Sequence, residues 1–221
     1  MKSAKASLFG NPYLGVYAIA NENICLVAKH MSDELIEIIK KTLDVEVKKV
    51  SIGGSGLLGI YAVMNSKGIV VPSLISTEEL EELKKLDLDI YVSESKFNAL
   101  GNNIAVNDNG GIINDEIPKE EADRLGECLG VELIPMKIKG YEVVGSLCAP
   151  TNKGFIVHND IREEKMKELE DIFKVRGMNS TANTGSYFVG LAFIANSKGC
   201  VVGEATSGFE LQRIQEGLEL T

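Results

Sequence analysis

The sequence predicts an α/β propeller with fivefold pseudosymmetry, built from five strand-strand-helix-strand repeats and closed into a ring by its N-terminal strand. Three observations lead to this fold class. Five segments of similar sequence recur along the chain, an amphipathic helical stretch follows each of them, and the two chain ends supply complementary parts of one repeat. Internal repeats of roughly 20 to 50 residues decide an architecture before local propensities do.

Each repeat opens with two short apolar segments separated by a polar turn. The five copies read GVYAIANENICLVA, GIYAVMNSKGIVVP, NIAVNDNGGIIN, SLCAPTNKGFIVH and GLAFIANSKGCVVG. When they are aligned, the turn of each copy carries an asparagine: Asn21, Asn65, Asn107, Asn152 and Asn196. Asparagine and glycine tolerate the positive φ of a tight turn, so the pattern predicts β-hairpins and requires no ligand to explain it.

A helix and a third strand are predicted after each hairpin. Within the second repeat, Leu80, Leu83 and Leu86 recur at helical spacing and indicate one apolar stripe. The five helical stretches are 32–43, 76–86, 118–129, 160–173 and 207–220. Further apolar segments follow at 45–52, 89–95 and 131–138. The unit is therefore strand, strand, helix, strand.

The starts of these helices carry capping chemistry. In three of them a cap residue is followed three positions later by glutamate: Ser76 with Glu79, Asp160 with Glu163, and Ser207 with Glu210. Such a pair satisfies free N–H groups of the first helical turn. Pro118 fits the first position of the third helix.

The two ends of the chain complement each other. The fifth repeat stops after its helix, while the segment 3–9 stands before the first repeat. We expect this segment to be the third strand of the fifth repeat, because the closed ring then leaves no repeat interface exposed. The prediction is a single domain, 1–221, with repeats at about 11–55, 56–100, 101–144, 145–189, and 190–221 plus 1–10. A five-bladed all-β propeller needs four strands per blade and leaves no room for the helices.

Composition and charge narrow the classes of function. The chain has 221 residues, of which 44% are hydrophobic and 25% charged, a balance typical of globular proteins. Its net charge of −9 disfavours naked nucleic acid and favours partners with basic surfaces. The first twenty residues lack the apolar stretch of a secretory signal, and no apolar run approaches the length that spans a bilayer. We therefore expect an intracellular protein without a membrane partner.

The sequence contains few residues arranged to bind a metal or a cofactor. The cysteines at 25, 128, 148 and 200 are too far apart for zinc or redox motifs, and we expect them to be reduced and buried. There are only two histidines, His30 and His158. The glycine-rich segment 51–59 lacks the lysine of a nucleotide-binding loop. No metal or cofactor is predicted.

Several segments resemble those of the translation initiation factor 6 family in its archaeal form. They are FGNPYLGVYA near the start, NALGNNIAVND at 98–108 and EVVGSLCAPTNKGFIVH at 142–158, and the resemblance covers the whole chain. It implies a pentein-type fold and a cytoplasmic, non-enzymatic factor for translation initiation and large-subunit maturation. Such a factor binds the joining face of the large ribosomal subunit as a monomer, mainly through ribosomal proteins with peripheral rRNA contact, and keeps the small subunit away.

The resemblance also suggests which residues contact the subunit. The junction at 98–103 is most similar to the family's subunit-contacting loop, and 59–61 has the matching position in the preceding repeat. The predicted contact residues are Gly59, Ile60, Tyr61, Leu100, Gly101, Asn102 and Asn103. Turn chemistry alone is the alternative explanation for these residues. We expect the five junctions to lie toward one end of the ring, around Gly10, Gly53, Gly101, Gly145 and Gly190.

An enzyme is the main alternative, because the same fold class hosts hydrolases and transferases that modify guanidino groups through a cysteine. His158, Asn159 and Asp160 are similar to a histidine-x-aspartate element of those enzymes, and Cys200 lies in the next repeat. However, a reactive thiolate needs a nearby cation or helix N-terminus, and no local residue provides one. A structural protein without a ribosomal role is a third possibility, which sedimentation with ribosomal subunits would distinguish.

Overall fold

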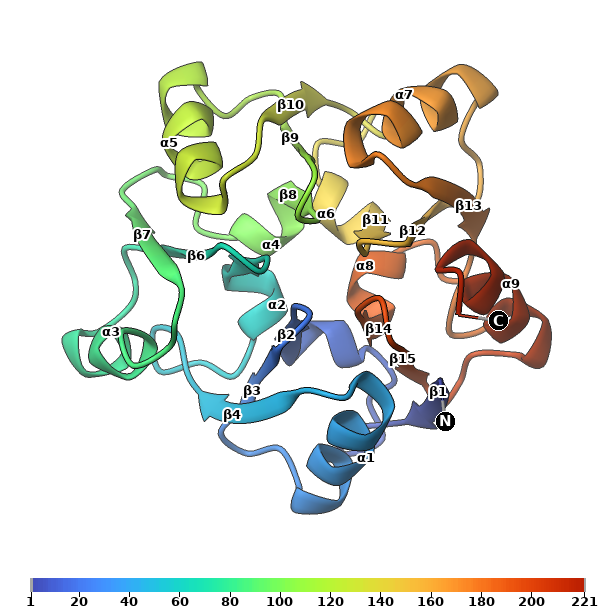
Figure 1. The fold of residues 1–221 in the computed structure, drawn as a ribbon, viewed down its shortest axis with the longest axis horizontal. Helices are drawn as coiled ribbons and strands as arrows, with labels where there is room; N and C mark the ends of the chain where they lie inside the picture. The colour runs from blue at the N-terminus through green and yellow to red at the C-terminus, as the bar shows by residue number, and fades with distance from the viewer. Residues whose placement is uncertain (1, 221) are drawn as a thin grey trace.

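Five three-stranded sheets stand around a common axis like the blades of a propeller (Figure 1). The structure is a computed structural model and describes residues 2–220. In each sheet an antiparallel hairpin is followed by a third strand that runs parallel to the middle one. The sheets comprise β2 (Ala18–Ala20), β3 (Ile24–Ala28) and β4 (Glu46–Val50); β5 (Val63–Met64), β6 (Gly68–Pro72) and β7 (Asp89–Ser93); β8 (Ile104–Val106), β9 (Gly111–Asn114) and β10 (Leu133–Met136); β11 (Cys148–Pro150), β12 (Gly154–His158) and β13 (Arg176–Ser180); and β14 (Phe193–Ala195), β15 (Cys200–Gly203) and β1 (Ser3–Ala6). The predicted fold class is confirmed.

The helices form an outer and an inner set. The outer helices lie at the perimeter of the ring in Figure 1 and are α1 (Asp33–Leu43), α3 (Thr77–Leu83), α5 (Lys119–Leu129), α7 (Glu163–Phe173) and α9 (Gly208–Gly217). Short inner helices surround the axis and were not predicted: η1 (Leu14–Val16), α2 (Leu58–Tyr61), α4 (Leu100–Asn103), α6 (Val144–Leu147) and α8 (Val189–Ala192). The segments interpreted from the sequence as junction loops are therefore single helical turns.

The hydrophobic core lies between the outer helices and the sheets. Ile39 and Leu43 of α1 are fully buried against Val27 of β3, and Val201 of β15 belongs to the same cluster. Helix α1 thus packs between its own sheet and the neighbouring one. Helix α3 ends three residues earlier than expected, but Leu86 still packs against the core of its repeat.

Two of the three predicted capping boxes are present. Ser76 and Ser207 each accept the N–H of the glutamate three residues later, and that glutamate accepts the N–H of the serine. The box at Asp160 is wrong, because Arg162 precedes α7 without a side-chain cap, and Asp160 instead forms an ion pair with Lys139. Pro118 stands one position before α5 rather than within it.

A belt of hairpin-turn side chains links neighbouring repeats. The Nδ2 atom of Asn21 donates to the carbonyl of Asn65 (2.9 Å), Asn65 donates to Asn107 (3.2 Å), Asn107 to Thr151 (2.9 Å) and Asn196 to Asn21 (3.2 Å). The fourth member is Thr151, so the alignment on Asn152 was wrong by one residue. Thr151 Oγ1 accepts the N–H groups two and three residues ahead, as the asparagine oxygens do in the other repeats.

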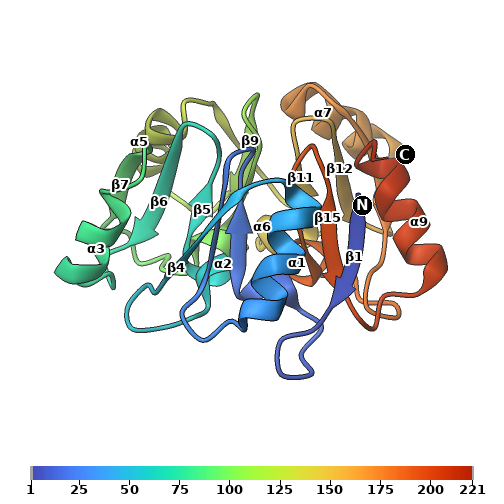
Figure 2. The same ribbon diagram turned by 60° about the horizontal axis from the view of Figure 1, so that its bottom comes forward.

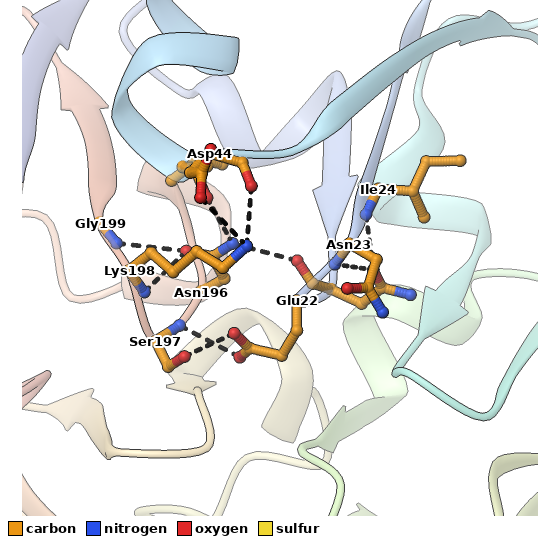
Figure 3. Close-up of polar contacts among 10 residues, drawn as sticks. Glu22, Asn23, Ile24, Asp44, Asn196, Ser197, Lys198 and Gly199 are labelled. Atoms are coloured by element: carbon orange, nitrogen blue, oxygen red, sulfur yellow. Dashed lines mark hydrogen bonds and ion pairs between the residues drawn. The ribbon is translucent and has the colours of Figure 1, made fainter.

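The ring closes where the fifth sheet incorporates the N-terminal strand. β1 pairs in parallel with β15, with Ser3 opposite Cys200 and Ala6 opposite Gly203, as predicted. Side chains add a second link at this seam (Figure 3): Ser197 bonds to Glu22 through its N–H and its hydroxyl, and Lys198 Nζ donates to the carbonyl of Asp44 (2.8 Å). The first and fifth repeats are therefore joined by backbone pairing and by polar side chains.

Candidate docking surface

Glycines allow the five inner helices to pack closely around the axis. A Cβ atom added at Gly59 would lie 1.7 Å from the carbonyl oxygen of Gly15, and one at Gly101 would lie 2.0 Å from that of Gly59. Gly145 and Gly190 repeat the contact at 2.1 Å and 2.0 Å, and Gly15 approaches Gly190 to close the circle. Because real Cβ atoms do not approach a carbonyl oxygen so closely, only glycine fits these positions.

The structure corrects the expected junction glycines. Gly10 and Gly53 lie in exposed turns with positive φ, whereas Gly15 and Gly59 occupy the inner-helix positions that match Gly101. The repeat spacing could have identified this set, since each glycine stands a few residues before the first apolar segment of its hairpin.

The predicted contact residues divide into two groups on α2 and α4. Leu100 is fully buried, Gly59 belongs to the glycine circle, and Asn103 is buried with its amide donating to Ala99 and accepting from Asn114. These three residues hold the inner helices. Gly101 is half-buried and belongs to the same glycine circle, whereas Ile60, Tyr61 and Asn102 are half-buried residues outside it.

Asn102 lies on the single turn of α4 rather than on the exposed loop that we expected. Its side-chain oxygen accepts a hydrogen bond from Ser146 Oγ of the next inner helix at 3.0 Å. The Asn102 side chain is half-buried, so part of its surface remains accessible at this end of the ring.

Large exposed apolar side chains lie at the end of the ring that also carries the inner helices. They follow strands that pair in parallel and are Phe9, Leu74, Tyr141, Tyr187, Phe188 and Phe209. Since parallel strands point the same way in every sheet, the segments after them gather at one end, which we call the turn end. Figure 2 shows β1 running down into the turn that projects at this end. Phe9 is 83% exposed and Phe209 is 71% exposed, and the sequence interpretation missed this set.

Two buried carboxylates fix the turns that carry this surface. Glu79 accepts the N–H groups of Gly53 (2.8 Å) and Gly54 (2.9 Å). Burial raises the pKa of its carboxyl, but hydrogen bonds from Ser76, Ser51, Gly54 and Gly53 outweigh burial and lower the pKa to about 2. A carboxylate that accepts several N–H groups is strongly stabilised in its charged form.

Glu210 has the same role in the fifth repeat. It accepts the N–H of Gly185 (2.8 Å) and that of Thr184 (3.2 Å). Burial again raises the pKa, and bonds from Ser207, Gly185 and Thr181 lower it to about 2. Both outer helices therefore hold an exposed turn through one ionised side chain.

The lowered pKa values of Glu79 and Glu210 make the folding stability depend on pH. Both folded-state pKa values lie below the ordinary value of 4.5, so the stabilisation is present above pH 4.5 and is lost as the pH falls toward 2. We expect each carboxylate to contribute on the order of 3 kcal/mol at neutral pH. Urea unfolding between pH 7 and pH 2 should show a steeper loss for the wild type than for Glu79→Gln/Glu210→Gln, whereas the exposed control Glu81→Gln should follow the wild type. Parallel curves for the double variant and the wild type would contradict this assignment.

The cysteines and His158 do not form a reactive pair. Cys200 is fully buried, and burial raises the pKa of its thiol to about 12. His158 Nδ1 accepts the N–H of Asp160 (3.0 Å), and the imidazole packs on Tyr187. Burial lowers the pKa of His158. Cys200 is therefore not held as an activated thiolate in this geometry.

All four cysteines are free, but the expectation that all are buried was wrong for Cys128, which is half-buried. Burial raises its pKa to about 11. Within residues 2–220 no group of three or more histidine, cysteine, aspartate or glutamate side chains could hold a metal ion. In the same part of the chain, no helix is long and apolar enough to cross a membrane.

Sequence comparison places the chain in a family. The model of the eIF-6 family matches residues 3–217. The chain belongs to this family. Among curated members, translation initiation factor 6 of Staphylothermus marinus is 42% identical over 99% of this chain and 98% of that protein, and the one from Pyrococcus horikoshii is 37% identical over 94% of both. The factor from Picrophilus torridus is 38% identical over 97% of this chain and 98% of that protein.

The structural comparison finds a more distant protein than these eIF-6 members. DDAH from Pseudomonas aeruginosa, solved as a mutant complexed with citrulline, has a TM-score of 0.46 and 14% identity, and the match covers 94% of this chain and 73% of that chain.

Proposed function

We propose that the chain binds the large ribosomal subunit through its turn end and sterically prevents association with the small subunit. Its role is then in translation initiation and large-subunit maturation, in the cytoplasm. Family membership supports this proposal, since the relatives are named translation initiation factor 6. We propose the turn end as the docking surface because exposed apolar side chains gather there. Large apolar groups on a surface commonly mark a protein interface.

The fold suits a steric role. The glycine circle, the belt of turn side chains and the paired β1 and β15 make one closed body, so docking it on one subunit excludes the other without a catalytic step. The net charge of −9 complements basic ribosomal proteins on the joining face and leaves rRNA contact peripheral. A monomer fulfils this role.

Asn102 is the best position at which to test the docking surface. We expect Asn102→Arg to weaken binding to isolated large subunits at least tenfold, about 1.4 kcal/mol. The added side chain is bulky and positive, and it would face a basic partner from the inner rim of the turn end. Co-sedimentation at increasing concentrations of the protein measures the affinity.

The matched control is Asn23→Arg, which makes the same substitution at an exposed position in the hairpin turn at the opposite end. It should bind within twofold of the wild type and melt near the wild-type temperature, whereas Asn102→Arg also loses the hydrogen bond from Ser146 and should melt lower while remaining folded, which circular dichroism can check. Equal losses in the two variants would show that added charge, and not the turn end, controls docking. Failure of the wild type to sediment with the large subunit would refute the proposed function.

A further inference from the structure

A cleft with an apolar floor opens on the outer rim of the ring, between the segment after β10 and the start of α7. Its volume is about 460 Å³. Met136, Ile138 and Leu169 are buried residues of the underlying core, and Ile161 packs against them. An apolar side chain placed in this cleft would therefore meet the hydrophobic core directly.

Cations surround this floor. Lys137, Lys139, Arg162 and Lys165 line the cleft, against a single lining carboxylate, Asp160. This excess of positive charge stands out in a chain whose net charge is −9.

Three of the cations have carboxylate partners. Lys139 pairs with Asp160 across the cleft. Lys165 pairs with Glu168 (2.5 Å), and Lys137 pairs with Glu142 (2.9 Å) and Asp115 (3.6 Å), but none of these three carboxylates lines the cleft. The pairs are at the surface, where water and salt weaken them, so an incoming anion can exchange with them at little cost.

We propose that this cleft binds an acidic protein segment that inserts one bulky apolar side chain. The apolar floor would take that side chain, and the cations around it would face carboxylates on either side of it. Such a partner matches the cleft in both charge and polarity. A nucleic-acid backbone would match only the cations, since none of the described residues that line the cleft is aromatic and could stack on a base.

The cleft lies at the turn end as well, because Lys139 and Gly140 belong to the turn that carries Tyr141, but it does not include the proposed docking residues on α2 and α4. It lies beside the outer helix α7, whereas those residues surround the axis (Figure 1). The proposal therefore does not depend on binding of the ribosomal subunit, and its test needs only the purified chain.

The test uses a short fluorescent peptide in which one phenylalanine stands between glutamates. We expect saturable binding by fluorescence anisotropy, with at least a tenfold loss for Lys139→Gln/Arg162→Gln. The control Lys41→Gln/Lys119→Gln removes the same charge from exposed positions on α1 and α5 and should bind within twofold of the wild type. A peptide with alanine in place of phenylalanine should also bind at least tenfold more weakly.

Three results would overturn the proposal. One is the absence of saturable binding by the folded wild type. Another is an equal loss in both double variants, which would indicate a general charge effect. The last is displacement of the peptide by poly(U) RNA together with indifference to the phenylalanine, which would indicate a polyanion site. Unchanged melting temperatures of the variants exclude unfolding as the cause of a loss.

Discussion

Deletion of residues 3–9 is expected to destabilise the whole protein, not only its N-terminus. The segment contains β1, which supplies the third strand of the fifth sheet and pairs with β15 along Cys200 to Gly203. Its loss exposes the edge of β15 and part of the shared core, to which Ala4 and Leu8 contribute. We expect a loss in unfolding free energy above about 4 kcal/mol, a much lower melting temperature and aggregation.

A synthetic peptide covering residues 2–9 provides the control for this deletion. Added in excess to the truncated protein, it should raise the melting temperature, because it can occupy the vacant edge of the fifth sheet. A peptide of the same composition in scrambled order should not. If the truncated protein melts like the full chain, β1 does not close the ring.

Substitution of Gly59 by alanine is expected to have the second large effect. In most helices this exchange is neutral or stabilises by roughly 0.5 to 1 kcal/mol. Here the new Cβ would lie 1.7 Å from the carbonyl oxygen of Gly15 and would force η1 and α2 apart. Because both sides of the contact are backbone, relief requires the ring itself to deform. We expect a destabilisation above about 3 kcal/mol in urea unfolding at neutral pH.

Gly208→Ala is the matched control for Gly59→Ala. Gly208 is the first residue of α9, and a Cβ atom there meets no other atom within 4 Å. The control should be as stable as the wild type or slightly more stable. Similar unfolding free energies for the two variants would show that the glycine circle is not under the steric constraint described above.

The repeat pattern was enough to predict the architecture. Hairpins at regular spacing, helices with serine caps and complementary chain ends all depend on local sequence, and the capping boxes at Ser76 and Ser207 show how reliably such signals determine helix starts. The pairing of segment 3–9 with the fifth sheet followed from counting strands in each repeat.

The errors arose where tertiary contacts decide between similar residues. Thr151 and Asn152 are both turn formers, but in the structure Thr151 Oγ1 accepts the turn N–H groups, whereas Asn152 Oδ1 accepts the N–H of Asp108 in the neighbouring repeat. Asp160 has the sequence of a helix cap, but the approach of Lys139 from another repeat draws it into an ion pair.

The residues of the proposed docking surface were even harder to predict from the sequence. An exposed phenylalanine such as Phe9 looks like a core residue in the sequence, and only the fold reveals that it projects from the turn end. Similarly, the inner helices were too short to produce a periodic pattern, so Asn102 was assigned to a loop.

The association of purified ribosomal subunits is the measurement that tests the central claim most directly. Large subunits incubated with an excess of the protein, then mixed with small subunits and separated on a sucrose gradient, should give a reduced peak of joined ribosomes. The protein should sediment with the free large subunits, and Asn102→Arg should leave the joined peak larger than the wild type does. A joined peak that is unchanged by saturating wild-type protein, or protein found on joined ribosomes, would contradict the proposed steric role.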